Sequence, residues 1–278
     1  MASAIPDPHT ALRAEWTQMQ NSLKSMLIPA DKDLSFDPAT FSGLEYVCGV
    51  DVSFFPASDL TPASSTQEAD PQSPATSDGE PSNIPPSEVA VVCMVVLAFP
   101  SLTLVHSLVR EVLLPIPYIP GFLAMRECPA VRHALTELAD AYPVQVLFVD
   151  GNGVWHPRGF GVASQVGVEN DIPTLGVAKN VLELPQDNIT KASLKERWQP
   201  VVANQSLLVV GTSGAVYGAC VKTVPGNPVF VSAGHRVGLD TAVRLTLACS
   251  RFRVPEPIRF ADHLGREYVR QKKNDDIC

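Results

Sequence analysis

The run VAVVCMVVLAF, residues 89 to 99, is the feature that most limits what this chain can fold into. Its eleven consecutive apolar residues are about half of the roughly 20 that a membrane-spanning helix needs. A run of this length without a polar residue is instead typical of a strand inside a covered sheet. It therefore predicts a buried strand in a globular protein.

Further apolar runs predict the rest of an α/β fold. Strands are expected at 44–54, 102–114, 144–149, 173–179, 206–211, 215–224 and 228–232, and helices at 9–28, at 121–141 with an interruption at Pro129, at 159–168, at 239–252 and at 260–273. The order after the first helix is β-β-β-α-β-α-β. Short links predict an antiparallel meander and helical links predict parallel strands, so we expect a central mixed β-sheet flanked by helices.

Residues 56–88 differ in composition from the rest of the chain. They contain seven prolines, seven serines, six acids and no lysine or arginine. Such a segment cannot build a core, so we predict a disordered acidic insertion within a single domain that spans 1–278. The insertion carries six of the eight net negative charges, so the net charge of −8 does not exclude a nucleic-acid partner.

The ends and the cysteines bear on the compartment. The N-terminus has neither a basic region nor an apolar segment, so we expect no secretion and no membrane association, and a cytoplasmic or nuclear address, the nucleolus included. The six cysteines form no CxxC pair and several lie in strand-like runs. This pattern predicts reduced thiols and argues against a zinc site.

Two acids stand where apolar strands would be expected to exclude them. Asp51 lies within VCGVDVSFF, and Asp150 follows VQVLFV, at the strand end where open α/β sheets bind ligands. Glu127 lies beside Arg126 near the start of a predicted helix, where a surface ion pair or a helix-dipole contact is, for this residue alone, the favoured alternative. If the three acids converge, they offer the oxygen ligands that Mg²⁺ prefers, with Mn²⁺ as a substitute.

Two further residues fit metal-assisted phosphoryl transfer. His156 could position or deprotonate the attacking water, and Lys179, at the end of the strand in GVAK, could neutralise a phosphate. The alternative for Lys179 is a cation that simply leaves the sheet for solvent. The glycines of DGNGVWHPRG, Gly151 and Gly153 among them, would allow backbone to approach a flat base closely.

The segment PIPYIPG, residues 115–121, mounts one aromatic ring on a stiff turn. Prolines, Pro117 among them, fix φ around Tyr118. The ring could stack on a base or wedge into a base step, and a packed structural tyrosine is the alternative.

Six motifs together resemble the endonuclease V family: VCGVDVSF, PYIPGFLAMRE, VLFVDGNGVWHPRGFGVAS, TLGVAK, SAGHRVGLDTA and VPEPIRFADHLGR. They occur in the family's order and span residues 44 to about 270. The resemblance implies a ribonuclease H-like fold and a Mg²⁺-dependent endonuclease, acting as a monomer on inosine-containing single-stranded RNA or DNA. Such enzymes cut the second phosphodiester bond 3′ to inosine and leave a 3′-hydroxyl and a 5′-phosphate.

The resemblance also implies roles for individual residues. Asp51, Glu127 and Asp150 would bind the metal, His235 would lie beside them and Lys179 would contact the phosphate. Tyr118, next to Pro117, would be the wedge, and a pocket for the flipped base would include Gly121, Leu123, Gly151, Gly153 and His156.

Two features depart from the family pattern. Gln165 stands where the family usually has histidine, so a proton-carrying role at that position is lost. The insertion follows the Asp51 strand, and its serine- and proline-rich composition favours a eukaryotic chain and hence RNA. Two alternatives stay open: another ribonuclease H-like nuclease directed to branched or damaged DNA, and a non-catalytic inosine-binding protein.

Overall fold

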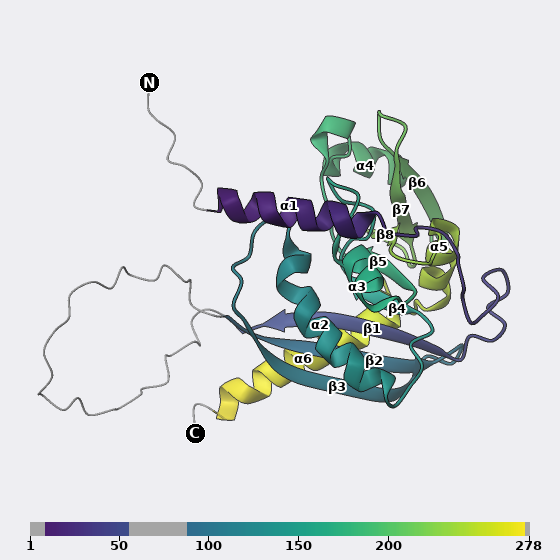
Figure 1. The fold of residues 1–278 in the computed structure, drawn as a ribbon. Coiled ribbons are helices and arrows are strands. Elements are labelled where there is room, and N and C mark those ends of the chain that lie inside the picture. The colour runs from purple at the N-terminus through teal and green to yellow at the C-terminus, as the bar shows by residue number, and fades with distance from the viewer. Residues whose placement is uncertain (1–8, 56–87, 276–278) are drawn as a thin grey trace, which may run out of the picture.

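The computed structural model describes residues 9–55 and 88–275 (Figure 1). Its strands are β1 (Tyr46–Phe54), β2 (Glu88–Ala98), β3 (Thr103–Leu114), β4 (Leu147–Asp150), β5 (Thr174–Ala178), β6 (Gln205–Val210), β7 (Val216–Lys222) and β8 (Val229–Ala233). Its helices are α1 (Thr10–Lys24), α2 (Leu123–Ala139), α3 (Val162–Asn170), the 3₁₀ turn η2 (Pro185–Asp187), α4 (Lys191–Trp198), α5 (Leu239–Ala248) and α6 (Glu256–Asp275).

All eight strands form one sheet in the order β3-β2-β1-β4-β5-β8-β7-β6. The first three strands are an antiparallel meander, and β1, β4 and β5 run parallel. The last three strands add a second antiparallel meander at the other edge. The expected mixed sheet, a meander followed by parallel strands with helices on both faces, is confirmed.

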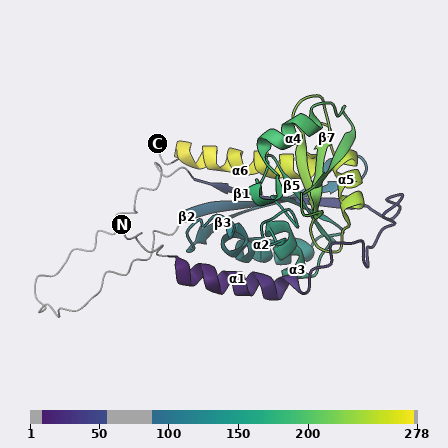
Figure 2. The same ribbon diagram turned by 90° about the horizontal axis from the view of Figure 1, so that it is seen from above.

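The β2 strand shows why residues 89–99 are apolar throughout. Cys93 lies in the core cluster that contains Ile258 of α6, whereas Met94 lies in the cluster that contains Leu138 of α2. Figure 2 shows α6 on one side of the sheet and α1, α2 and α3 on the other. Because alternate residues of a strand point to opposite faces, a strand between two helical layers needs apolar residues at every position.

Several element bounds differ from the prediction. The last helix begins at Glu256 because Pro257 lies in its first turn, where the missing N–H is not needed. The α2 helix runs through Pro129. The α4 helix was not predicted from its polar sequence, and a capping box formed by Thr190 and Ser193 begins it.

The predicted insertion and the expected absence of a membrane span can be compared only with the described residues. Glu88, the last residue of the predicted insertion, begins β2, and residues 56–87 lie outside the described part of the chain. Within the described part, no helix is both long and apolar enough to cross a membrane.

Candidate active site

The parallel pairing of β1 and β4 brings two of the predicted acids together. Val50 pairs with Val149, so the next residues, Asp51 and Asp150, lie side by side where β4 ends and its pairing with β1 stops. The α6 helix crosses this edge and adds Asp262. One carboxylate oxygen from each of these three acids lies within 4.8 Å of the others. Three distant segments of the chain therefore converge on one acidic cluster.

Lys179 follows β5 and faces this cluster. Its Nζ lies 2.6 Å from Asp150 Oδ2 and 2.9 Å from Asp262 Oδ1. Burial disfavours the charged ammonium, but the two carboxylates outweigh burial and raise the pKa of Lys179. The lysine is therefore held charged in the cleft, and the alternative that it leaves the sheet for solvent is wrong.

Lys179 neutralises only part of the negative charge of these acids. Burial first, and then the hydrogen bond and charge of Asp150, raise the pKa of Asp51 to about 7. Burial and then the charge of Asp51 raise the pKa of Glu127 to about 8. Glu127 is buried near the start of α2 and lies outside the group of three oxygens. The cleft thus holds more negative charge than its own cations balance.

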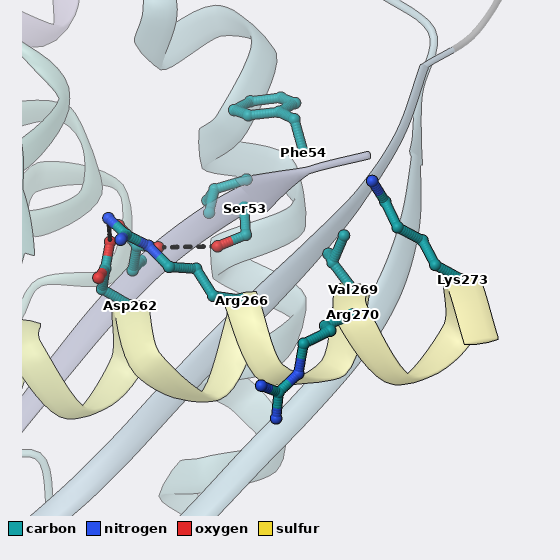
Figure 3. Close-up of a pocket in the computed structure, with 9 residues that line it drawn as sticks. Ser53, Phe54, Asp262, Arg266, Val269, Arg270 and Lys273 are labelled. Atoms are coloured by element: carbon teal, nitrogen blue, oxygen red, sulfur yellow. Dashed lines mark hydrogen bonds and ion pairs between the residues drawn. The ribbon is translucent and has the colours of Figure 1, made fainter. Parts of the chain in front are cut away.

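A groove of about 470 Å³ leads away from the cluster between β1 and α6 (Figure 3). Asp51 and Asp262 lie at its acidic end, and Ser53 Oγ donates a 3.1 Å hydrogen bond to Asp51 Oδ2. Its α6 wall carries the cations Arg266, Arg270 and Lys273. At about 1.5 Å per helical residue, this wall extends about 16 Å from Asp262.

A second pocket, of about 190 Å³, lies between α2, α3 and the loop after β4. Its lining includes five of the residues expected to hold a base: Tyr118, Gly121, Leu123, Gly151 and His156. The ring of Tyr118 is 62% exposed, so it is not the packed structural tyrosine that the sequence left open.

The conformations of two glycines explain the shape of this pocket. Gly121 has φ +82°, a left-handed value that favours glycine. At Gly151, with φ +148°, a Cβ atom would lie 2.5 Å from Val162 Cγ1. Side chains at these positions would strain the backbone or fill the pocket, so the base-sized space depends on glycine.

His156 forms part of the wall of this pocket. Its Nε2 lies 3.2 Å from the carbonyl of Gly121, and its Nδ1 accepts a 3.3 Å hydrogen bond from Arg158 N. A carbonyl can only accept, so the proton is on Nε2. Burial, and then the nearby Arg158, lower the pKa of His156 to about 4. Both nitrogens contact protein groups, an arrangement that favours a place in the pocket wall over the activation of water.

Three of the expected site residues lie elsewhere. Gly153 packs on β8, where a Cβ atom would lie 1.9 Å from the carbonyl of Ala233, and Pro117 is not part of the pocket lining. His235 was expected beside the acids, but it lies at the other end of β5. Its backbone pairs with Thr174 at the start of β5, whereas Lys179 follows the end of β5, about 16 Å along the strand.

Asp262 was not predicted as a site residue, although its position in the sequence is unusual. Ile258, Gly265 and Val269 form the buried seam of α6, and Asp262 occupies the seam position between them. An acid on the apolar stripe of a helix is as anomalous as an acid inside an apolar strand. The pattern that identifies Asp51, an acid among apolar residues, therefore identifies Asp262 as well.

The family and structure comparisons agree with this geometry. The endonuclease V family model matches residues 66–263. Human endonuclease V is 38% identical over 92% of this chain and 83% of the relative. The crystal structure of its catalytic domain superposes with a TM-score of 0.79 and covers 96% of this chain and 99% of that chain.

A solved complex is also similar. Endonuclease V of Ciona intestinalis, in complex with a DNA 24mer containing an inosine followed by a ribo-adenosine, matches with a TM-score of 0.76 and 31% identity. The match covers 94% of this chain and 99% of that chain.

Proposed function

Because the chain belongs to the endonuclease V family and is thereby a nuclease, we propose that it hydrolyses inosine-containing single strands with a divalent metal ion bound at the acid cluster. The observation that carries the proposal is the convergence of Asp51, Asp150 and Asp262 beside Lys179. A protein that only bound inosine would gain nothing from three crowded carboxylates, which cost stability unless a cation joins them.

The acids fit Mg²⁺, with Mn²⁺ as a substitute. All are carboxylates that offer oxygen ligands, and burial together with the neighbouring carboxylates raises the pKa values of Asp51 and Glu127, so a cation would stabilise their ionised forms. Asp51, Asp150 and Asp262 would hold the ion, and Glu127 lies close enough to Asp51 and Asp150 for their charges to raise its pKa. When bound, the ion supplies Lewis-acid stabilisation of the scissile phosphate and of the attacking water.

The remaining residues of the cleft position the strand. Lys179 holds its ammonium between Asp150 and Asp262, where it can orient and neutralise a phosphate oxygen. The cations on the α6 wall of the groove can follow the backbone phosphates away from the cut. We assign the cut to the second phosphodiester bond 3′ to inosine, which yields a 3′-hydroxyl and a 5′-phosphate.

The pocket behind Tyr118 would receive the base. Its glycine-shaped walls and the carbonyl of Gly121 can read the edge of a hypoxanthine, while the exposed ring of Tyr118 fills the place that the base leaves. An unpaired base costs least to extract, so single strands are the preferred substrate. The inosine in the Ciona complex supports this assignment.

RNA is the proposed biological substrate. The Ciona complex has a ribonucleotide directly after the inosine, which supports acceptance of a 2′-hydroxyl at that position. A protein of this kind would act as a monomer in the cytoplasm or the nucleus.

The test is a cleavage panel. End-labelled RNA and DNA strands with one inosine, and matched strands with adenosine, are incubated with Mg²⁺ or with EDTA, and the product ends are mapped. We expect one cut, after the nucleotide that follows inosine, only with Mg²⁺ and faster in RNA. Intact inosine strands, or equal cutting of adenosine strands, would refute the proposal.

A further inference from the structure

A third pocket, of about 270 Å³, adjoins the cleft on the other side of Lys179. It lies between α4, the start of β8 and the segment that joins α5 to α6. Of its ten lining residues, four are cationic and none is acidic. In a chain with a net charge of −8, such a pocket favours an anionic ligand.

The cations of this pocket are available to a ligand. Lys191 and Lys195 lie one turn apart on the exposed face of α4, and neither ammonium forms an ion pair with a carboxylate among residues 9–55 and 88–275. The guanidinium of Arg253 is tied to backbone carbonyls, with Nη2 3.1 Å from Pro228 O. Carbonyls position this charge without neutralising it.

The floor of the pocket is aromatic and apolar. Phe230 is buried beneath it, and Trp198 is partly buried beside it, in the same hydrophobic cluster. Two amide side chains, Asn180 and Asn227, stand at its edge. A ring surface, amides and a cationic rim together match a nucleotide, because they offer stacking, base-edge hydrogen bonds and phosphate contacts in one place.

The link to the cleft is direct. The side chain of Lys179 reaches the acid cluster, while its carbonyl accepts a hydrogen bond from Arg253 and its residue lines the new pocket. A nucleic-acid strand whose scissile phosphate lies at Lys179 would therefore pass next to this pocket.

We infer that this pocket, lined by Lys191, Lys195, Trp198 and Arg253, is a nucleotide subsite for the strand that flanks the scissile phosphate. The inference rests on the proposed function and extends it, because it assigns a second binding site on the same strand outside the base pocket. The subsite would contact backbone phosphates and stack on any base, so its sequence preference should be weak.

The test combines protein variants with strand length. Anisotropy measures binding of the full chain, without divalent metal, to labelled inosine single strands that are trimmed by one nucleotide at a time on either side of the cut. We expect Lys191→Ala/Lys195→Ala to weaken binding of the longest strand about five- to tenfold. The slope of log affinity against log salt should fall by about 1.4 for two lost phosphate contacts.

The decisive result is non-additivity. Once one side is trimmed short of the pocket, wild type and variant should bind equally. The control, Lys32→Ala/Arg251→Ala, removes the same charge from exposed positions near the opposite end of the sheet and should leave binding unchanged. Equal weakening at every length, equal weakening in the control, or no weakening would overturn the inference.

A second readout tests the ring. Strand binding should quench tryptophan fluorescence, and Trp198→Phe should remove that quench while it keeps an aromatic floor. Undiminished quenching would exclude contact with Trp198. Cleavage of the same strands with Mg²⁺ separates the two claims: if wild type does not cut, the proposed function fails, and if it cuts while the lysine pair has no effect on binding, only the subsite fails.

Discussion

Asp51 and Asp187 are both buried aspartates, yet their surroundings shift their pKa values in opposite directions. Hydrogen bonds from the side chain and backbone of Ser213 lower the pKa of Asp187 to about 2, whereas burial and Asp150 raise that of Asp51 to about 7. Asp187 Oδ1 also accepts a 3.0 Å bond from Thr212 Oγ1. Asp187 accepts hydrogen bonds from several donors, whereas Asp51 accepts one from Ser53 and lies beside two other carboxylates.

The difference separates a structural acid from a functional one. Asp187 ties the turn after β6 to η2 and is satisfied within the protein. Asp51 lies beside Asp150 and Asp262, and a cation from outside would balance their combined negative charge. The predictions below test this contrast, from the largest expected effect to the smallest.

Removal of each charge should have opposite consequences. Asp51→Asn should reduce cleavage of inosine strands by at least about a thousandfold, because a metal-binding carboxylate is lost. Asp187→Asn should leave the cleavage rate of the folded protein unchanged and lower its melting temperature, because a neutral amide replaces an anion that accepts hydrogen bonds from Thr212 and Ser213. A slow Asp187→Asn enzyme with an unchanged melting temperature would break the contrast.

The same contrast applies to Asp262, which was not predicted from the sequence, and to His235, which was predicted to lie beside the acids. Asp262→Asn should reduce cleavage about a hundredfold, because it weakens a metal site, whereas His235→Gln should keep activity within about threefold. Initial rates at saturating Mg²⁺ measure both. Activity that depends on His235 and not on Asp262 would contradict the site as the structure assembles it.

Tyr118 tests the base pocket independently of the acids. Tyr118→Ala should weaken binding of an inosine single strand by about 1 kcal/mol or more, roughly fivefold, if the exposed ring stacks on the strand. Tyr217, which is tied to Asp187, offers the matched control: Tyr217→Phe should leave binding unchanged. Equal affinities of wild type and Tyr118→Ala would remove the wedge from the account.

The pKa shifts predict how stability depends on pH without metal. A raised pKa means that the contribution of Asp51 is present below pH 4 and is lost as pH rises through about 7. Between pH 5 and 8 the melting temperature of wild type should therefore fall relative to Asp51→Asn, by about 2–4 °C for each kcal/mol. The gap between wild type and Asp187→Asn should stay constant, because Asp187 is ionised throughout. A constant gap for Asp51→Asn would show that the cleft is not crowded.

The smallest effect is expected at Gln165, the departure from the family pattern. Its Nε2 donates a 2.7 Å hydrogen bond to Glu169 Oε1 within α3, and its Oε1 is buried without a partner. Gln165→His should change the cleavage rate by less than about threefold, since this side chain is engaged away from the acid cluster. A tenfold gain would place position 165 in the catalytic machinery after all.

Local patterns were enough to predict the sheet and most of the site. The apolar run at 89–99 predicted a strand covered on both faces, and an acid interrupting an apolar strand identified Asp51. The α4 helix was not predicted because a short polar helix has no apolar periodicity. The start of α6 was predicted too late in the chain because Pro257 suggested that the helix begins after it.

What the sequence could not supply is distance between remote segments. His235 and Asp262 both belong to motifs of the family, and only the path of the chain shows that His235 lies at the start of β5 and Asp262 lies beside Asp51 and Asp150. The role of Gly153 likewise depends on β8, which lies about 80 residues further along the chain. The backbone N–H of Gly153 donates a hydrogen bond to Ser232 Oγ of this strand.

The central claim is that the crowded acids of the cleft are completed by a metal ion. Thermal unfolding of the full chain, measured while Mg²⁺ is titrated at pH 8 without nucleic acid, tests it directly, because an ion that binds only the folded state raises the melting temperature. Wild type and Asp187→Asn should both be stabilised, whereas Asp51→Asn should not respond. Equal stabilisation of Asp51→Asn, or no response of wild type to either Mg²⁺ or Mn²⁺, would contradict the account.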